Sequence, residues 1–191
     1  RLSAYVAGLP VREGGVWGNH DEHTDSGGHK IDPHVWLDPE NAKRMAAEIA
    51  KRLSAFDSEN SSVYESNATA LAVSIDQAAR DVENVLAPVK TIPYVVFHDA
   101  YQYFESRFDM NAVGSIMINP ERPPGAARIS DVRRKIRETG AACVFHEPQF
   151  KPKLVETVIR GGAAKSAPLD PIGVGISPGP RAYQQLLLSL A

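Results

Sequence analysis

Apolar residues recur at helical spacing through the first half of the chain. Asp38 can cap a helix that starts at Pro39 and runs to about residue 54. Its apolar stripe, which should be buried, consists of Ala42, Met45, Ala46, Ile49 and Leu53. A second stripe without glycine or proline covers residues 61–86 and consists of Tyr64, Ala68, Leu71, Ile75, Ala78, Val82 and Leu86. The second helix, about 40 Å long at ~1.5 Å per residue, is long enough to connect two lobes.

After Pro88, short apolar runs alternate with helical segments. The runs cover residues 94–97, 112–118, 142–145 and 167–169, and the segments lie near residues 100–108, 126–138, 152–160 and 180–190. These four units predict an α/β fold, with a four-stranded, mainly parallel sheet flanked by helices and preceded by the long helix. The chain then divides into a loop-rich region (1–31), a helical region (32–88) and an α/β unit (89–191). We expect Asp99 to cap the helix near 100–108, and Cys143 to be a buried thiol.

Composition narrows the possible functions. The 43% hydrophobic content of the 191 residues supports a packed core. The 21 basic and 23 acidic residues give a net charge of -2 without an extended basic cluster, which argues against nucleic-acid binding. No apolar run approaches the roughly 18 residues needed to span a bilayer, so the sequence is not expected to cross a membrane.

Histidines and carboxylates follow the ends of the predicted elements. His34 lies just before the first helix, His98 follows the first apolar run and Asp170 follows the fourth. The carboxyl ends of parallel strands share one rim of a sheet, and imidazole and carboxylate are zinc ligands. We therefore predict a metal site of these three residues. Alternatively, His34 only ends a turn beside Trp36, and Asp170 only caps the turn that follows it.

Two further groups are candidates for metal chemistry. Glu147 follows the third apolar run and is a candidate to orient a metal-bound imidazole, since zinc-bound histidines usually donate their second N–H to an oxygen. A buried glutamate with other partners, or a helix cap, is the alternative. His20, His23 and His29 lie in an acidic, glycine-rich loop that is a possible second metal site. A solvated polar loop is the alternative there.

Four motifs together carry a resemblance to a known family. They are Asp32–Leu37 (DPHVWL), Phe97–Phe104 (FHDAYQYF), Cys143–Phe150 (CVFHEPQF) and Leu169–Gly173 (LDPIG). From about residue 20 to 190, the chain resembles the periplasmic zinc-binding proteins, the solute-binding components of bacterial ABC-type zinc uptake systems. The resemblance implies two lobes joined by one long helix, with Zn²⁺ bound between them. It also implies capture of Zn²⁺ in the periplasm and delivery to an ABC transporter permease in the inner membrane, without catalysis.

The resemblance also suggests roles for individual residues. It implies that His34 and His98 are metal histidines, and that Asp170 occupies the position of a carboxylate ligand in manganese and some zinc relatives. The segment with His20, His23 and His29 resembles a histidine-rich loop thought to collect or sense zinc.

The same resemblance implies that parts of the family pattern lie outside this sequence. The family's first metal histidine, with most of the amino-terminal lobe, would precede Arg1, and the usual disulfide partner of Cys143 would follow Ala191. The chain is then the linker helix plus the carboxy-terminal lobe, and residues 1–31 include the end of the amino-terminal lobe. The alternatives are a manganese or iron carrier that uses Asp170 and Glu147, a zinc-dependent hydrolase and an adhesin-like surface protein.

Overall fold

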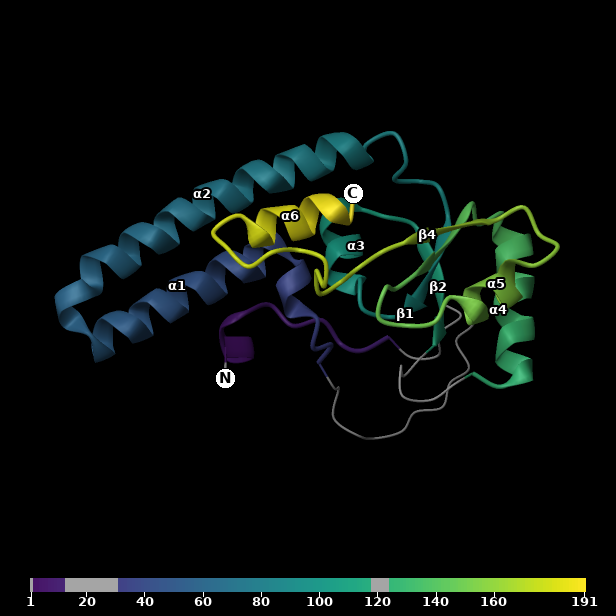
Figure 1. The fold of residues 1–191 in the computed structure, drawn as a ribbon, viewed down its shortest axis with the longest axis horizontal. Coiled ribbons are helices and arrows are strands. Elements are labelled where there is room, and N and C mark those ends of the chain that lie inside the picture. The colour runs from purple at the N-terminus through teal and green to yellow at the C-terminus, as the bar shows by residue number, and fades with distance from the viewer. Residues whose placement is uncertain (1, 13–30, 118–123) are drawn as a thin grey trace.

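A parallel sheet with helices on both faces forms the body of the molecule (Figure 1). The structure, a computed structural model, describes residues 2–12, 31–117 and 124–191. The strands are β1 (Tyr94–His98), β2 (Ala112–Met117), β3 (Cys143–His146) and β4 (Lys165–Pro168). They lie in the order β2-β1-β3-β4, and all neighbouring pairs are parallel. The predicted α/β fold with a four-stranded sheet is confirmed.

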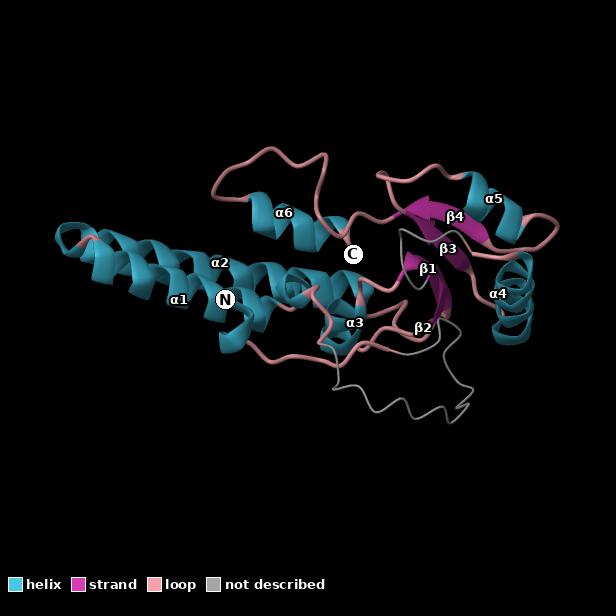
Figure 2. Cartoon of the chain, turned by 90° about the horizontal axis from the view of Figure 1, so that it is seen from below, coloured by secondary structure: helices cyan, strands magenta, loops and turns pink. Residues whose placement is uncertain are grey.

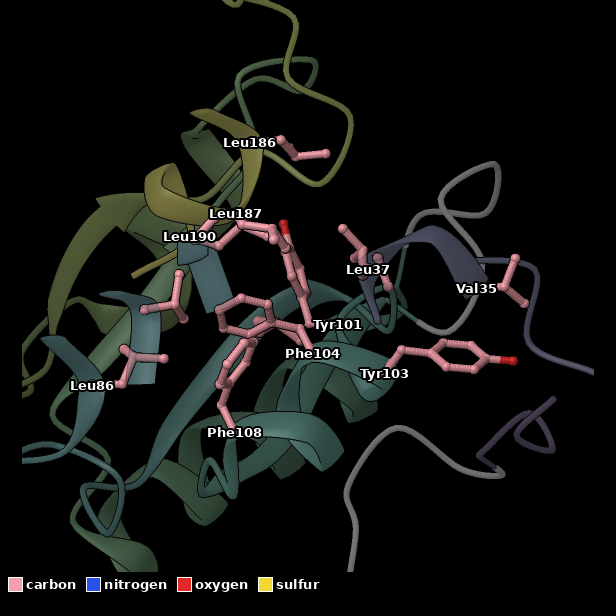
Figure 3. Close-up of a cluster of buried hydrophobic side chains, with 14 of the residues drawn as sticks. Val35, Leu37, Leu86, Tyr101, Tyr103, Phe104, Phe108, Leu186, Leu187 and Leu190 are labelled. Atoms are coloured by element: carbon pink, nitrogen blue, oxygen red, sulfur yellow. The ribbon is translucent and has the colours of Figure 1, made fainter. Parts of the chain in front are cut away.

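Strand β1 supplies side chains to two separate cores, because successive residues of a strand point to opposite faces. Tyr94 and Val96 belong to a core shared with α2 (Ser61–Leu86), α3 (Gln102–Phe108) and α6 (Ala182–Ser189), part of which is drawn in Figure 3. Val95 and Phe97 belong to a second core shared with α4 (Ala126–Thr139) and α5 (Lys153–Ile159). The sheet is therefore covered on both faces, as all-parallel sheets usually are.

Helices α1 (Pro39–Phe56) and α2 form a hairpin that extends well beyond the sheet (Figures 1 and 2). As predicted, Asp38 caps α1: its Oδ1 accepts a hydrogen bond from the backbone N–H of Glu40 at 3.0 Å. Lys43 of α1 pairs with Asp76 of α2 at 2.5 Å. The second helix begins and ends where the sequence pattern placed it.

The apolar stripe of α1 is only partly buried, which corrects the expectation from the sequence. Ala42 is buried, but Ile49 and Leu53 near the hairpin tip keep 43% and 41% of their surface exposed. On α2 likewise, Ile75 and the later stripe residues are buried, whereas Tyr64 is not. The reason is geometric, because the tip of the hairpin lies past the edge of the α/β body (Figure 2).

Two residue-level predictions need revision. Asp99 does not cap α3, because the cap position is Tyr101, which makes no side-chain cap hydrogen bond. Asp99 instead pairs with the guanidinium of Arg12. Cys143 is a free thiol that is half-buried at the start of β3, and this burial raises its pKa, so the thiol stays protonated near neutral pH.

Among the described helices, none has the length and apolar character needed to cross a bilayer.

Candidate metal centre

A buried carboxylate holds the imidazole of His34. This residue precedes a short 3₁₀ helix, Val35–Leu37, and Asp32 Oδ1 lies 2.7 Å from its Nδ1. The same oxygen accepts the backbone N–H of His34 at 2.9 Å. Asp32 is only 3% exposed. Since an ionised carboxylate only accepts hydrogen bonds, Nδ1 carries the proton and Nε2 is left for a metal ion.

His98 is held in the same way at the end of β1. Its Nδ1 lies 2.5 Å from Oε1 of Glu147, which follows β3 and is 2% exposed. The neighbouring His146 has a different partner, because its Nδ1 lies 3.0 Å from Ser166 Oγ. The contact expected between Glu147 and an imidazole is therefore present, and the imidazole is that of His98. As in His34, Nε2 of His98 is left for a metal ion.

The two imidazoles lie next to each other although 64 residues separate them in the sequence. The centroids of the His34 and His98 rings are 5.4 Å apart, and the ring planes meet at 61°. An ion about 2.1 Å from a ring nitrogen lies roughly 3.2 Å from the ring centroid, so two rings on a tetrahedral ion are about 5 Å apart. The observed spacing fits one shared zinc ion.

The positions of His98 and Glu147 follow from the strand order. In the order β2-β1-β3-β4, the chain leaves β1 toward one edge of the sheet and then crosses back to β3 on the other side. Ligand sites of open parallel sheets lie at the carboxyl ends of the strands where the order reverses. His98 and Glu147 lie at this point of the sheet.

Asp170 has partners of its own in the turn after β4. Its Oδ1 accepts hydrogen bonds from Gln149 Nε2 at 2.6 Å and from the backbone N–H of Ile172 at 3.1 Å. Its Oδ2 accepts the N–H of Val174 at 2.6 Å. Within residues 2–12, 31–117 and 124–191, no group of three or more histidine, cysteine, aspartate or glutamate side chains is arranged to hold a metal ion. Asp170 thus does not complete a three-residue group here, and its metal role stays a prediction.

Two hydrogen bonds hold the turn after β4 against the rest of the centre. Trp36 Nε1 donates to the carbonyl oxygen of Pro171 at 2.9 Å, and the Tyr101 hydroxyl donates to the carbonyl oxygen of Leu169 at 2.9 Å. Burial, followed by the nearby charge of Glu147, raises the pKa of Tyr101. The hydroxyl therefore remains a donor.

The candidate loop ligands His20, His23 and His29 lie outside the described residues.

Comparison with known proteins identifies the family of this chain. Residues 3–191 match the family described as zinc-uptake complex component A, periplasmic, or ZnuA. The chain belongs to the ZnuA family. This membership does not favour the manganese or iron carrier or the hydrolase.

Individual ZnuA proteins show how far the likeness extends. The chain is 52% identical over 162 residues to the high-affinity zinc uptake system protein ZnuA of Brucella abortus (strain 2308). These residues make up 85% of this chain and 48% of that protein. The chain is 36% identical over 185 residues to ZnuA of Yersinia pestis, and the match covers 94% of this chain and 58% of that protein. A crystal structure of a ZnuA deletion mutant with zinc bound superposes with a TM-score of 0.70 at 26% identity, covering 83% and 58%. The chain spans about half the length of the curated relatives.

Sequence reasoning did not single out two residues of the centre. The role of Asp32 has a local signal, an aspartate two residues before a histidine, which lets the carboxylate accept the backbone N–H of His34. Arg12 offers no such signal. It lies 87 residues before Asp99, so only the fold brings the two together.

Arg12 joins two carboxylates beside the centre. Its NH1 lies 2.7 Å from Glu105 Oε2, and its Nε donates to Asp99 Oδ2 at 3.0 Å. Burial lowers the pKa of Arg12, but the charges of Glu105 and Asp99 outweigh this effect and leave it raised. Burial also raises the pKa of Glu105 to about 7, although the charge of Arg12 opposes the change.

The raised pKa of Glu105 predicts a loss of stability with rising pH. The native protein holds the proton more tightly than the unfolded chain, so the stabilisation is complete below about pH 4.5 and is lost as the pH rises through about 7. At about 1.4 kcal/mol per pKa unit, this amounts to roughly 3 kcal/mol. Urea unfolding of the wild type and Glu105→Gln from pH 4.5 to 8 should show a shallower decline for the variant. Parallel declines would contradict the prediction, and the exposed Glu138→Gln is the matched control.

Proposed function

We propose that this protein is a zinc-binding solute-binding protein, which captures Zn²⁺ in the periplasm and delivers it to an ABC transporter permease in the inner membrane. One observation carries the proposal. His34 and His98 lie at the spacing of two ligands on one ion, and a buried carboxylate orients each imidazole. ZnuA relatives named for high-affinity zinc uptake support the same cargo. Because the chain spans about half of these relatives, delivery is proposed for the whole protein.

The donor atoms favour zinc over manganese. Two imidazole nitrogens suit zinc, whereas manganese prefers carboxylate and water oxygens. Hydrogen bonds from Nδ1 to Asp32 and Glu147 increase the basicity of each imidazole. We propose Asp170 as a further ligand, since its Oδ2 accepts one hydrogen bond, from Val174, and keeps a lone pair for a cation. The division of the chain into residues 1–31, 32–88 and 89–191 also stays a proposal.

Capture and release of an ion require no general base. A zinc hydrolase would keep an open coordination position with a base in reach. The buried carboxylates beside the two imidazoles, Asp32 and Glu147, are both occupied with orienting a ring. This arrangement supports binding of the ion rather than activation of a water molecule.

A calorimetric titration of the chain with Zn²⁺ in the presence of Mn²⁺ tests the proposal. Two proteins should be compared, the wild type and a variant with His20, His23 and His29 all replaced by alanine. We expect both to bind one zinc ion at the His34 and His98 site, with no displacement by a tenfold excess of Mn²⁺. If the triple variant binds no zinc, the metal belongs to the loop, and preferential binding of manganese would reject the zinc assignment.

A further inference from the structure

A short segment near the amino end runs between the two histidine-bearing turns. Residues 7–12, here called the strap, are attached to the first turn by a hydrogen bond from the Asp32 backbone N–H to the Leu9 carbonyl oxygen at 2.9 Å. The fully buried Asn41 of α1 holds the start of the strap, because its side-chain amide exchanges two hydrogen bonds of 3.0 Å with the backbone of Ala7. The strap is therefore fixed on the His34 side of the centre.

The hydroxyl of Tyr103 connects the strap and Asp32 to α3. It accepts the backbone N–H of Leu9 at 2.8 Å and donates to the backbone carbonyl oxygen of Asp32 at 3.0 Å. Tyr103 is itself buried, and it belongs to the same core as Val35 and Leu37 of the 3₁₀ helix (Figure 3). Since α3 begins four residues after His98, this one hydroxyl joins the backbone that carries each histidine.

Arg12 makes the second connection, at the other end of the strap. Its guanidinium contacts both carboxylate oxygens of Asp99 and also lies 2.7 Å from Glu105 Oε2. Asp99 is the residue directly after His98, and Glu105 belongs to α3. An arginine fork that pairs with a carboxylate through two nitrogens restricts its orientation as well as its distance. Arg12 therefore holds the turn between β1 and α3.

We propose that Tyr103 and Arg12 are positioning residues, which hold the two histidine-bearing turns at the separation that lets His34 and His98 share one metal ion. The inference rests on the proposed function, since it assigns these residues a role in the same centre. Neither residue needs to contact the ion. Their effect comes from fixing the geometry, and a supporting shell of this kind typically changes metal affinity by about 10- to 100-fold.

Cobalt(II) is the probe for the test, because its visible spectrum reports the coordination geometry. The chain with alanine at His20, His23 and His29 serves as the parent, so that loop histidines add no signal. Tyr103→Phe keeps the aromatic ring and removes only the two hydrogen bonds. Tyr64→Phe removes a comparable bond, 2.7 Å to Asp57 at the hairpin tip, and is the matched control. Zinc affinity is measured by displacement of the cobalt.

We expect Tyr103→Phe to bind zinc about 10-fold more weakly and to change the cobalt spectrum, with Tyr64→Phe unchanged on both measures. Arg12→Gln should weaken binding as well, and Arg12→Lys should restore part of it because the charge is kept. This pair keeps the inference testable if Tyr103→Phe does not fold.

Two results would overturn the inference, and they differ in what else they imply. If the parent's cobalt spectrum is lost in His98→Ala but unchanged in Tyr103→Phe and Arg12→Gln, the positioning role fails and the proposed function stands. If the parent's spectrum does not depend on His98, the proposed function fails as well.

Discussion

Replacing His98 with alanine is expected to weaken zinc binding at least about 100-fold. The change removes one of the two nitrogen ligands and also leaves the buried carboxylate of Glu147 without its imidazole partner. Loss of an orienting partner alone costs about 10- to 100-fold, and loss of the ligand should cost no less. Competition against a chelator of known zinc affinity would measure the change.

The control for this variant is His146→Ala. His146 ends the neighbouring strand β3, but its imidazole contacts Ser166 instead of a carboxylate of the centre. It should keep the zinc affinity of the wild type. Equal affinity of His98→Ala and the wild type would reject His98 as a ligand, and equal losses in the two variants would indicate a general effect of removing histidines.

Replacing Leu187 with alanine is expected to lower the free energy of unfolding by about 2–5 kcal/mol. This side chain of α6 is 0% exposed in the core drawn in Figure 3, so its removal leaves a cavity that the packed surroundings fill only in part. Urea unfolding followed by circular dichroism would measure the loss.

The next residue of the same helix provides a matched comparison. Leu188 is 44% exposed, and its replacement by alanine should change the free energy of unfolding by no more than about 0.5 kcal/mol. Similar losses in Leu187→Ala and Leu188→Ala would show that α6 does not pack into this core as described.

The helices were predictable because their apolar spacing reflects local geometry. The 26 residues of α2 carry an uninterrupted stripe, and the bounds of the helix agree with it. Burial of that stripe was harder to predict, since spacing shows which residues share a face but not whether another layer covers it. This is why Ile49 and Leu53 of α1 were expected to be buried and are not. Strand β4, Lys165–Pro168, begins two residues before its apolar run because it pairs through backbone groups.

The candidate centre was predictable in part. His34, His98 and Glu147 stand in motifs at the ends of elements, and the structure brings all three together. The role of Asp99 was predicted wrongly because its local position suits a cap, whereas a distant guanidinium offers a stronger partner than a backbone N–H. Partners such as Arg12 depend on tertiary contacts, which no local pattern contains.

The α1–α2 hairpin also has a mechanical consequence. Helix α2 is buried from Ile75 to its carboxyl end, and the part before it, residues 61–74, extends past the α/β body as a rod about 21 Å long at ~1.5 Å per residue. A rotation of about 5° at Ile75 would displace the start of the helix by roughly 2 Å at that length. The hairpin would act as a lever arm, on which a small change of packing angle within the α/β body gives a larger movement at the hairpin tip.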